Sequence, residues 1–120
     1  MRVKDIESAV KYIALKFTGI EGLRALVNFA NMTEEQAMAK AHHGLGRTLR
    51  NEMELWGKNN ITEYFKRLGI SHADDMSGIL VTCFHRKLND KPYGLDGQVE
   101  EYKKYWAEEA EKESADKLKA

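Results

Sequence analysis

Apolar residues recur at helical spacing along almost the whole chain. Ile6, Ala9, Val10 and Ile13 follow the i, i+3, i+4, i+7 pattern of a helix with one buried face. Similar stripes cover residues 6–17, 20–30, 38–56, 64–68, 76–88 and 99–110. The apolar run 79–84 resembles a buried strand when taken alone, but its spacing and flanking caps favour a helix. The pattern therefore predicts an all-α fold of about six helices.

Residues that cap helices support these boundaries. The expected starts are Asp5, Thr18 with Glu21, Thr33 with Gln36, and Asn60 with Glu63. Gly57 is an expected stop, and Gly69 followed by Ile70 predicts a Schellman ending in which Ile70 folds back onto its helix. The connection around Thr18 and Gly19 is so short that the first two helices form either one bent helix or an αα-hairpin.

The longest predicted helix spans about residues 33–56 and is expected to be the central element. Residues 1–107 are predicted to form a single compact helical domain. Residues 108–120 alternate in charge and contain few large apolar side chains, so they are expected to form a solvated helix end.

Composition narrows the class of protein. The chain has 120 residues, and its 19 Lys and Arg balance its 19 Asp and Glu. This length suits one domain, and the neutral balance gives no general electrostatic case for nucleic acid or an anionic membrane. One cysteine permits neither an internal disulfide nor a cysteine zinc site, and together with the absence of a signal-like N-terminus it favours the cytoplasm. No cofactor and no membrane segment are expected.

Several polar residues do not fit a plain helical bundle. On a helical wheel of the 33–56 helix, His42 falls near the middle of the apolar stripe with Gly46 beside it, while Arg47, Arg50 and Asn51 lie on the flank. Two interpretations remain open. Either helices cross closely at Gly46 and His42 is hydrogen-bonded inside the core, or these residues form a binding edge.

A second polar cluster, His72 to Asp75, precedes the next apolar stripe. Carboxylates in a first helical turn complement the helix dipole, and imidazole and carboxylate groups also ligate metals. Capping is the favoured interpretation, and no metal site is predicted. The sequence has no metalloprotease, phosphate-loop or paired-cysteine motif, and Cys83 lies on an apolar face that predicts an inert core thiol.

A basic run on the third and fourth predicted helices raises the alternative of a nucleic-acid interface. Its members are Arg47, Arg50, Lys58, Lys66 and Arg67. Aromatic residues do not interleave with them on the same face, so nucleic-acid binding is not the favoured interpretation.

Two segments resemble an uncharacterised bacterial domain family. The first is the run His42-His43-Gly44-Leu45-Gly46-Arg47-Thr48-Leu49-Arg50-Asn51, followed by Leu55-Trp56, and the second is the run from Gly69 to Ile79 containing His72-Ala73-Asp74-Asp75-Met76-Ser77. The resemblance implies no particular activity. Where the family has Pro this chain has Ala73, and where it often has Gly this chain has Glu54, which implies a less sharply defined turn before Trp56. The matched residues suggest that Arg50 pairs with Asp74 or Asp75 and joins two helices.

We therefore expect a small cytosolic interaction module that binds a protein partner, such as an accessory protein of a phage or mobile element that inhibits a host complex. The alternatives are a ligand-binding or enzymatic domain built on the same polar residues, and a nucleic-acid binder. No catalytic residue is predicted. The candidate binding residues are His42, Arg47, Arg50, Asn51, Trp56, His72, Asp74 and Asp75.

Overall fold

The computed structural model describes residues 3–119, and over this range the chain is entirely helical, with seven helices and no strand. The helices are α1 (Ile6–Ala14), α2 (Gly19–Asn31), α3 (Glu34–His42), α4 (Leu45–Glu52), α5 (Asn60–Arg67), α6 (Ala73–Leu88) and α7 (Leu95–Lys119). The predicted all-α class is confirmed, although about six helices were expected. Residues 1, 2 and 120, at the ends of the predicted division into 1–107 and 108–120, lie outside the described range.

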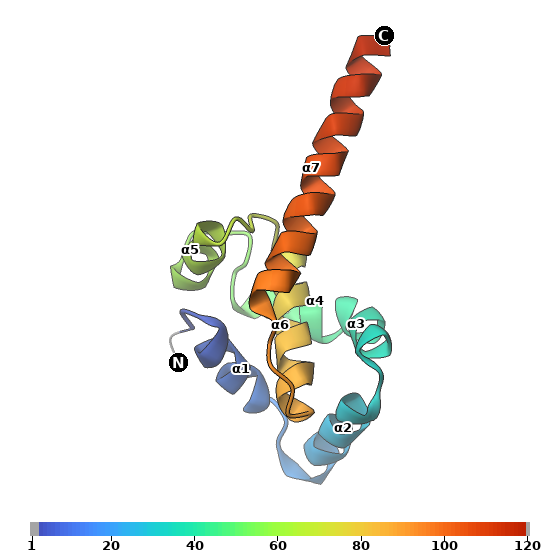
Figure 1. Cartoon of the computed structure of the whole chain (residues 1–120). Coiled ribbons are helices and arrows are strands. Elements are labelled where there is room, and N and C mark those ends of the chain that lie inside the picture. Colours follow the sequence, from blue (N-terminus) through green and yellow to red (C-terminus); the bar gives the residue numbers. More distant parts are fainter. Residues whose placement is uncertain (1–2, 120) are drawn as a thin grey trace.

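The central element is α6, which packs against α1, α2, α3, α4 and α7 (Figure 1). Ten of its sixteen residues are buried, and Phe84, Ile79 and Leu80 are among its fully buried side chains. Burial of its apolar surface is the main stabilising term of the fold. The run 79–84, which resembled a buried strand, is helical, as its spacing and flanking caps predicted.

The prediction of one continuous helix over 33–56 is wrong. The chain turns at His43 and Gly44, and this turn separates α3 from α4. Gly44 stands at the N-cap of α4 with φ −107° and ψ −102°, outside the ordinary helical and extended regions. The apolar stripe continues across this break, with Ala37 and Ala41 buried on α3 and Leu49 buried on α4. A stripe of constant period does not reveal a change of helix direction.

The end of α4 also differs from the prediction. The helix stops at Glu52, and Glu54 adopts φ +50° in the left-handed region. The Leu55 N–H donates to the Arg50 carbonyl at 3.0 Å and the Glu54 N–H to the Asn51 carbonyl at 3.3 Å, which is the hydrogen-bond pattern of a Schellman motif. Leu55 is consequently buried and Trp56 is 67% exposed, although the predicted apolar stripe of residues 38–56 ends at Trp56.

Most of the predicted helix starts are confirmed. Asp5 and Thr33 form capping boxes with Ser8 and Gln36. The cap of α5 lies one residue earlier than predicted, at Asn59 with Thr62, and Thr18 makes no side-chain cap although it precedes α2.

The Schellman ending at Gly69 and Ile70 is confirmed. Gly69 has φ +93°, the Ile70 N–H donates to the Phe65 carbonyl at 2.9 Å, and Ile70 is buried.

The last helix projects away from the other six. Figure 1 shows α7 crossing α6 near its start and then extending beyond the body, which gives the molecule dimensions of 58 × 30 × 24 Å. The helix runs through residue 107 without a break, and Val99 is its buried contact with the core. None of the helices over residues 3–119 is both long enough and apolar enough to span a membrane.

Candidate functional site

Arg50 joins three helices and is itself buried. Its Nη1 donates to Ser77 Oγ at 2.9 Å, its Nη2 donates to the His42 carbonyl at 3.0 Å, and its Nε lies 3.4 Å from Asp74 Oδ1. The guanidinium group thereby connects α4 to the end of α3 and to the first turn of α6. Of the two partners that were suggested for Arg50, Asp74 and Asp75, the structure shows Asp74, and each of the three guanidinium nitrogens has a partner within the protein.

Gly46 gives this guanidinium its space. A Cβ atom at position 46 would lie 3.3 Å from Arg50 Nη1 and 3.0 Å from the Ala41 carbonyl oxygen. The close approach expected at Gly46 is therefore real, and it involves the α3 backbone and the Arg50 side chain.

His42 contributes its carbonyl group rather than its imidazole to this cluster. Its side chain is exposed and packs edge-to-face against His43, with ring centroids 4.7 Å apart. Of the two interpretations left open for His42, the core position is wrong, because it assumed one helical phase for the whole of 33–56, whereas α3 ends at His42 and the chain turns before α4. Arg47 and Asn51 are also exposed on α4, and neither lines the groove described below.

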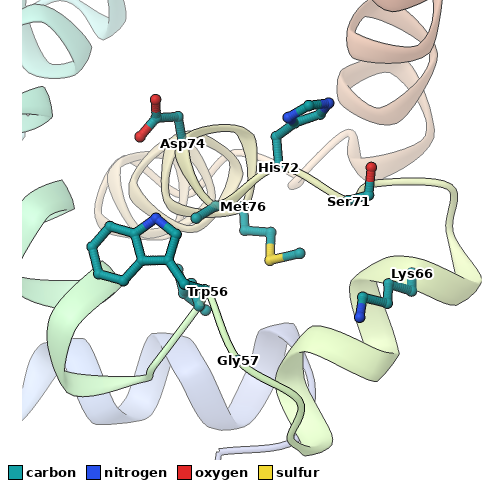
Figure 2. A pocket seen from close by; sticks show the side chains of 9 residues that line it. Trp56, Gly57, Lys66, Ser71, His72, Asp74 and Met76 are labelled. Carbon is teal, nitrogen blue, oxygen red and sulfur yellow. The ribbon is translucent and has the colours of Figure 1, made fainter.

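Trp56 lies beside a separate cavity at the start of α6. This cavity has a volume of about 320 Å³, and Figure 2 shows Trp56 and Lys66 on opposite sides of it with Met76 between them. His72 and Asp74 also line it. These two residues are shared with a larger groove on the other side, so four of the eight predicted binding residues, Trp56, His72, Asp74 and Asp75, surround the first turn of α6.

The first turn of α6 is joined to α7 by an aromatic contact. His72 is the N-cap residue of α6, but its side chain makes no cap hydrogen bond and instead stacks on Trp106 at a centroid distance of 3.8 Å and an angle of 12°. Trp106 Nε1 donates to Asp75 Oδ2 at 2.8 Å. Asp74 and Asp75 lie in the first turn as predicted, but their side-chain contacts are to Arg50 and Trp106 rather than to helix N–H groups.

A groove of about 730 Å³ runs between α3, α6 and α7, and we call it the acidic groove. It is lined by Glu34, Met38, His72, Asp74, Asp75, Thr82, Arg86, Gln98, Glu101, Tyr102, Tyr105 and Trp106. Asp75, Thr82 and Arg86 are seven and four residues apart, which places them on one face of α6, and they form the floor together with Asp74. The α7 members follow the spacing of one helix face and form a wall.

The charge of the acidic groove differs from that of the whole chain. Four carboxylates and one guanidinium line it, which gives a formal charge of −3 with His72 neutral, whereas the chain is neutral overall. Glu34 binds the single guanidinium, with its Oε1 2.7 Å from Arg86 Nε and its Oε2 3.1 Å from Arg86 Nη2. These hydrogen bonds hold the pKa of Glu34 below its ordinary value.

The aromatic residues give the acidic groove an apolar component. Tyr105 is 52% exposed and Trp106 is 40% exposed, and their rings pack edge-to-face at 5.1 Å. Tyr102 is half-buried, and burial, followed by the nearby Asp75 and Glu101, raises its pKa, so its hydroxyl stays protonated near neutral pH.

Sequence reasoning missed most of this wall. The signal was present in the α7 residues Gln98, Glu101, Tyr102, Tyr105 and Trp106, which recur at i, i+3, i+4, i+7 and i+8. The same pattern is typical of a core-facing stripe. Only the direction in which α7 leaves the body shows that part of this face remains open.

Metal-ligating side chains and the single cysteine are the other candidate chemical groups. Over residues 3–119 no three His, Cys, Asp or Glu side chains lie close enough together to hold a metal ion. Cys83 is fully buried, as predicted, and burial raises the pKa of its thiol to about 11, which keeps it protonated at neutral pH.

Comparison with known proteins places the chain in a family. A model described as a domain of unknown function, DUF6794, matches residues 4–88, and the chain belongs to this family. The predicted membership of an uncharacterised domain family is confirmed. No curated protein and no solved structure matches the chain. The matched residues contain the Arg50 cluster and the floor of the acidic groove, whereas α7 lies beyond them.

Proposed function

We propose that this protein is a cytoplasmic interaction module that binds a partner protein by accepting a basic, amphipathic helix of that partner in the acidic groove. The observation that carries the proposal is the combination of a −3 charge with exposed aromatic rings in one groove of a neutral chain. Carboxylates along a groove select positive partners, and aromatic rings supply apolar contact and cation–π attraction for Lys or Arg.

The shape of the acidic groove favours a helical segment. Its floor extends along α6 from His72 to Arg86, which corresponds to about 21 Å of helix. Walls from α3 and α7 stand on its two sides. An amphipathic helix presents residues at i, i+3, i+4 and i+7 and fits such a channel, which is a common mode of peptide recognition.

Charge argues against the chain's own last helix as the occupant. Residues 108–119 carry five carboxylates and three lysines, which gives a net charge of −2. The projecting part of α7 from a second copy would therefore be repelled by the acidic groove. A basic partner is attracted by it and associates faster at low salt.

A peptide-binding measurement tests the proposal. The probe is a fluorescein-labelled amphipathic peptide of about 15 residues, with Leu on one face and Arg on its flanks. We expect saturable binding that weakens with added salt, and at least about tenfold weaker binding of the same peptide with Glu in place of Arg. Equal binding of the two peptides contradicts the proposal.

Matched charge-reversal variants locate the site. Glu101→Lys changes the wall of the acidic groove, and Glu111→Lys makes the same change on the exposed, projecting part of α7. We expect the first variant to weaken binding of the basic peptide and the second to leave it unchanged. Equal effects would mean that overall charge, rather than this groove, attracts the peptide.

The alternative functions have weaker support. An enzyme or anion-binding domain using Arg50 needs a free guanidinium group, but this one is engaged by Ser77, Asp74 and the His42 carbonyl. A nucleic-acid interface along the basic run from Arg47 to Arg67 could not use Arg50, because the same contacts engage its guanidinium group. The narrower role of a phage or mobile-element inhibitor suits such a module and is tested by identifying a natural partner.

A further inference from the structure

Helix α2 is attached to the body in an unusual way. It has no buried residue, although Leu26 and Phe29 on one side are apolar and half-buried, and Ile20, Leu23 and Val27 on the other side are apolar and exposed. A helix that is apolar on both sides is normally enclosed by protein. Here the inner side is only partly filled, which leaves space beneath the helix.

That space is a cavity of about 290 Å³ between α2, the start of α4 and the chain around Phe17. Its apolar lining comprises Phe17, Ala25, Phe29, Met32, Ala41 and Leu45. Phe17 and Phe29 both stack on the buried Phe84, at centroid distances of 5.7 and 5.8 Å, so one side of the cavity is a fixed aromatic surface. This volume is at the small end of ligand pockets, which span about 300–1,000 Å³.

Together with Gly44, two polar side chains complete the lining, Asn28 on α2 and Lys40 on α3. Both are exposed, so they stand at the rim rather than in the interior. Across residues 3–119 no carboxylate lies within 4.0 Å of the Lys40 ammonium group. An apolar cavity with an ammonium donor and an amide donor at its rim is complementary to a molecule with an apolar body and a negatively charged end.

We propose that this cavity binds a small amphipathic carboxylate, with its aliphatic chain against Phe17, Phe29 and Met32 and its carboxylate at Lys40 and Asn28. This site is separate from the acidic groove, so it does not depend on the proposed function. A bound chain would also fill the space beneath α2 and strengthen the attachment of that helix.

Calorimetric titration with octanoate, octanol and octylammonium tests the proposal. We expect saturable binding in the order octanoate, octanol, octylammonium, and an increase in the thermal midpoint with octanoate. Lys40→Met is expected to weaken octanoate binding up to about fivefold, the range for an exposed ion pair, and to leave octanol binding unchanged. The loss of selectivity, rather than of all binding, identifies the role of Lys40.

Two variants in which phenylalanine replaces alanine locate the ligand. Ala25→Phe fills the cavity from α2, whereas Ala39→Phe places the same side chain on an exposed position of α3 that does not line it. We expect octanoate binding to be lost in the first variant and retained in the second, with both folded by circular dichroism. Absence of saturable octanoate binding by the wild type, equal binding of octanoate and octylammonium, or equal behaviour of the two variants would overturn the proposal.

Discussion

Single residues determine how α4 is joined to its neighbours, and Arg50 is the clearest case. Its side chain is buried and makes hydrogen bonds to Ser77 and the His42 carbonyl, while the carboxylate of its ion-pair partner Asp74 is 68% exposed. Because solvent already stabilises Asp74, most of the stabilisation from this cluster comes from the two hydrogen bonds. The cluster is therefore a structural connection between helices.

Removal of the Arg50 guanidinium group is expected to destabilise the protein. Arg50→Met should lower the free energy of unfolding by about 1–3 kcal/mol, because the His42 carbonyl and the Ser77 hydroxyl lose a charged donor. Urea unfolding measures this change. Arg47→Met, on the exposed side of the same helix, should change stability by no more than about 0.5 kcal/mol, and equal losses in the two variants would show that the connection is unimportant.

Glu54 occupies a backbone conformation that suits glycine. Its φ of +50° and its place after the end of α4 make it the C′ residue of a Schellman motif. Glu54→Gly should stabilise the protein by about 1 kcal/mol, since the left-handed conformation costs a residue with a Cβ about that much. Thermal or urea unfolding checks the sign. Glu63→Gly, within α5, should have the opposite effect, and stabilisation by both or by neither contradicts this explanation.

The residue types at the helix ends predicted several caps correctly, but they predicted the turn at Glu54 only in part. Asp5, Thr33 and Gly69 act locally, so their neighbours in sequence were sufficient to identify them. The resemblance drew attention to position 54, where the family often has Gly. It did not show that Glu54 is left-handed, because that conformation depends on the burial of Leu55 against the rest of the protein.

At the scale of helices, the contact between α6 and α7 depends on Gly78. A Cβ atom at this position would lie 2.7 Å from the Tyr102 hydroxyl oxygen, whereas a Cβ atom at Gly97 meets nothing within 4 Å. Gly78→Ala should therefore displace Tyr102 and lower stability despite the better helix propensity of alanine. Gly97→Ala should raise stability by up to about 1 kcal/mol. Stabilisation by both substitutions would show that α7 does not pack closely on α6.

The ion pair between Glu34 and Arg86 connects α3 to α6 and makes stability depend on pH. Arg86 lowers the pKa of Glu34 below its ordinary value of 4.5, so this pair stabilises the folded state fully above that pH, and the contribution is lost as the pH falls through the lower folded pKa. Glu34→Gln should flatten the loss of stability between neutral and acidic pH. Glu35→Gln, at an exposed position on the same helix, should retain the wild-type slope.

The helical periodicity predicted the type of secondary structure correctly, but it did not predict where one helix ends and the next begins in a new direction. Helical spacing identified the all-α fold because it records which residues face a core. The break at Gly44 was missed because the stripe stays continuous from Ala41 through Leu49. Arg50 was expected to pair with Asp74 or Asp75, and the pair with Asp74 is present. The interior was one of two interpretations for His42, and its imidazole is exposed.

At the scale of the whole molecule, the acidic groove exists because α7 leaves the body at an angle. The aromatic residues of α7 cover α6 only in part, and carboxylates of α3, α6 and α7 line the groove that remains open. No pattern within one helix predicts this arrangement, because the groove depends on the relative placement of three helices. Sequence analysis listed His72, Asp74 and Asp75 as candidate binding residues, but it did not list the α7 residues that form the wall of the groove.

The two tryptophans allow a direct test of the account. Trp106 lines the acidic groove, where its Nε1 donates to Asp75, and Trp56 lies outside the groove beside the smaller cavity. Each indole N–H gives a separate NMR signal in nitrogen-15-labelled protein. On titration with the basic amphipathic peptide, we predict that the Trp106 signal shifts progressively to saturation while the Trp56 signal stays in place. A shift of the Trp56 signal alone, or of neither signal, would contradict the acidic groove as the binding site.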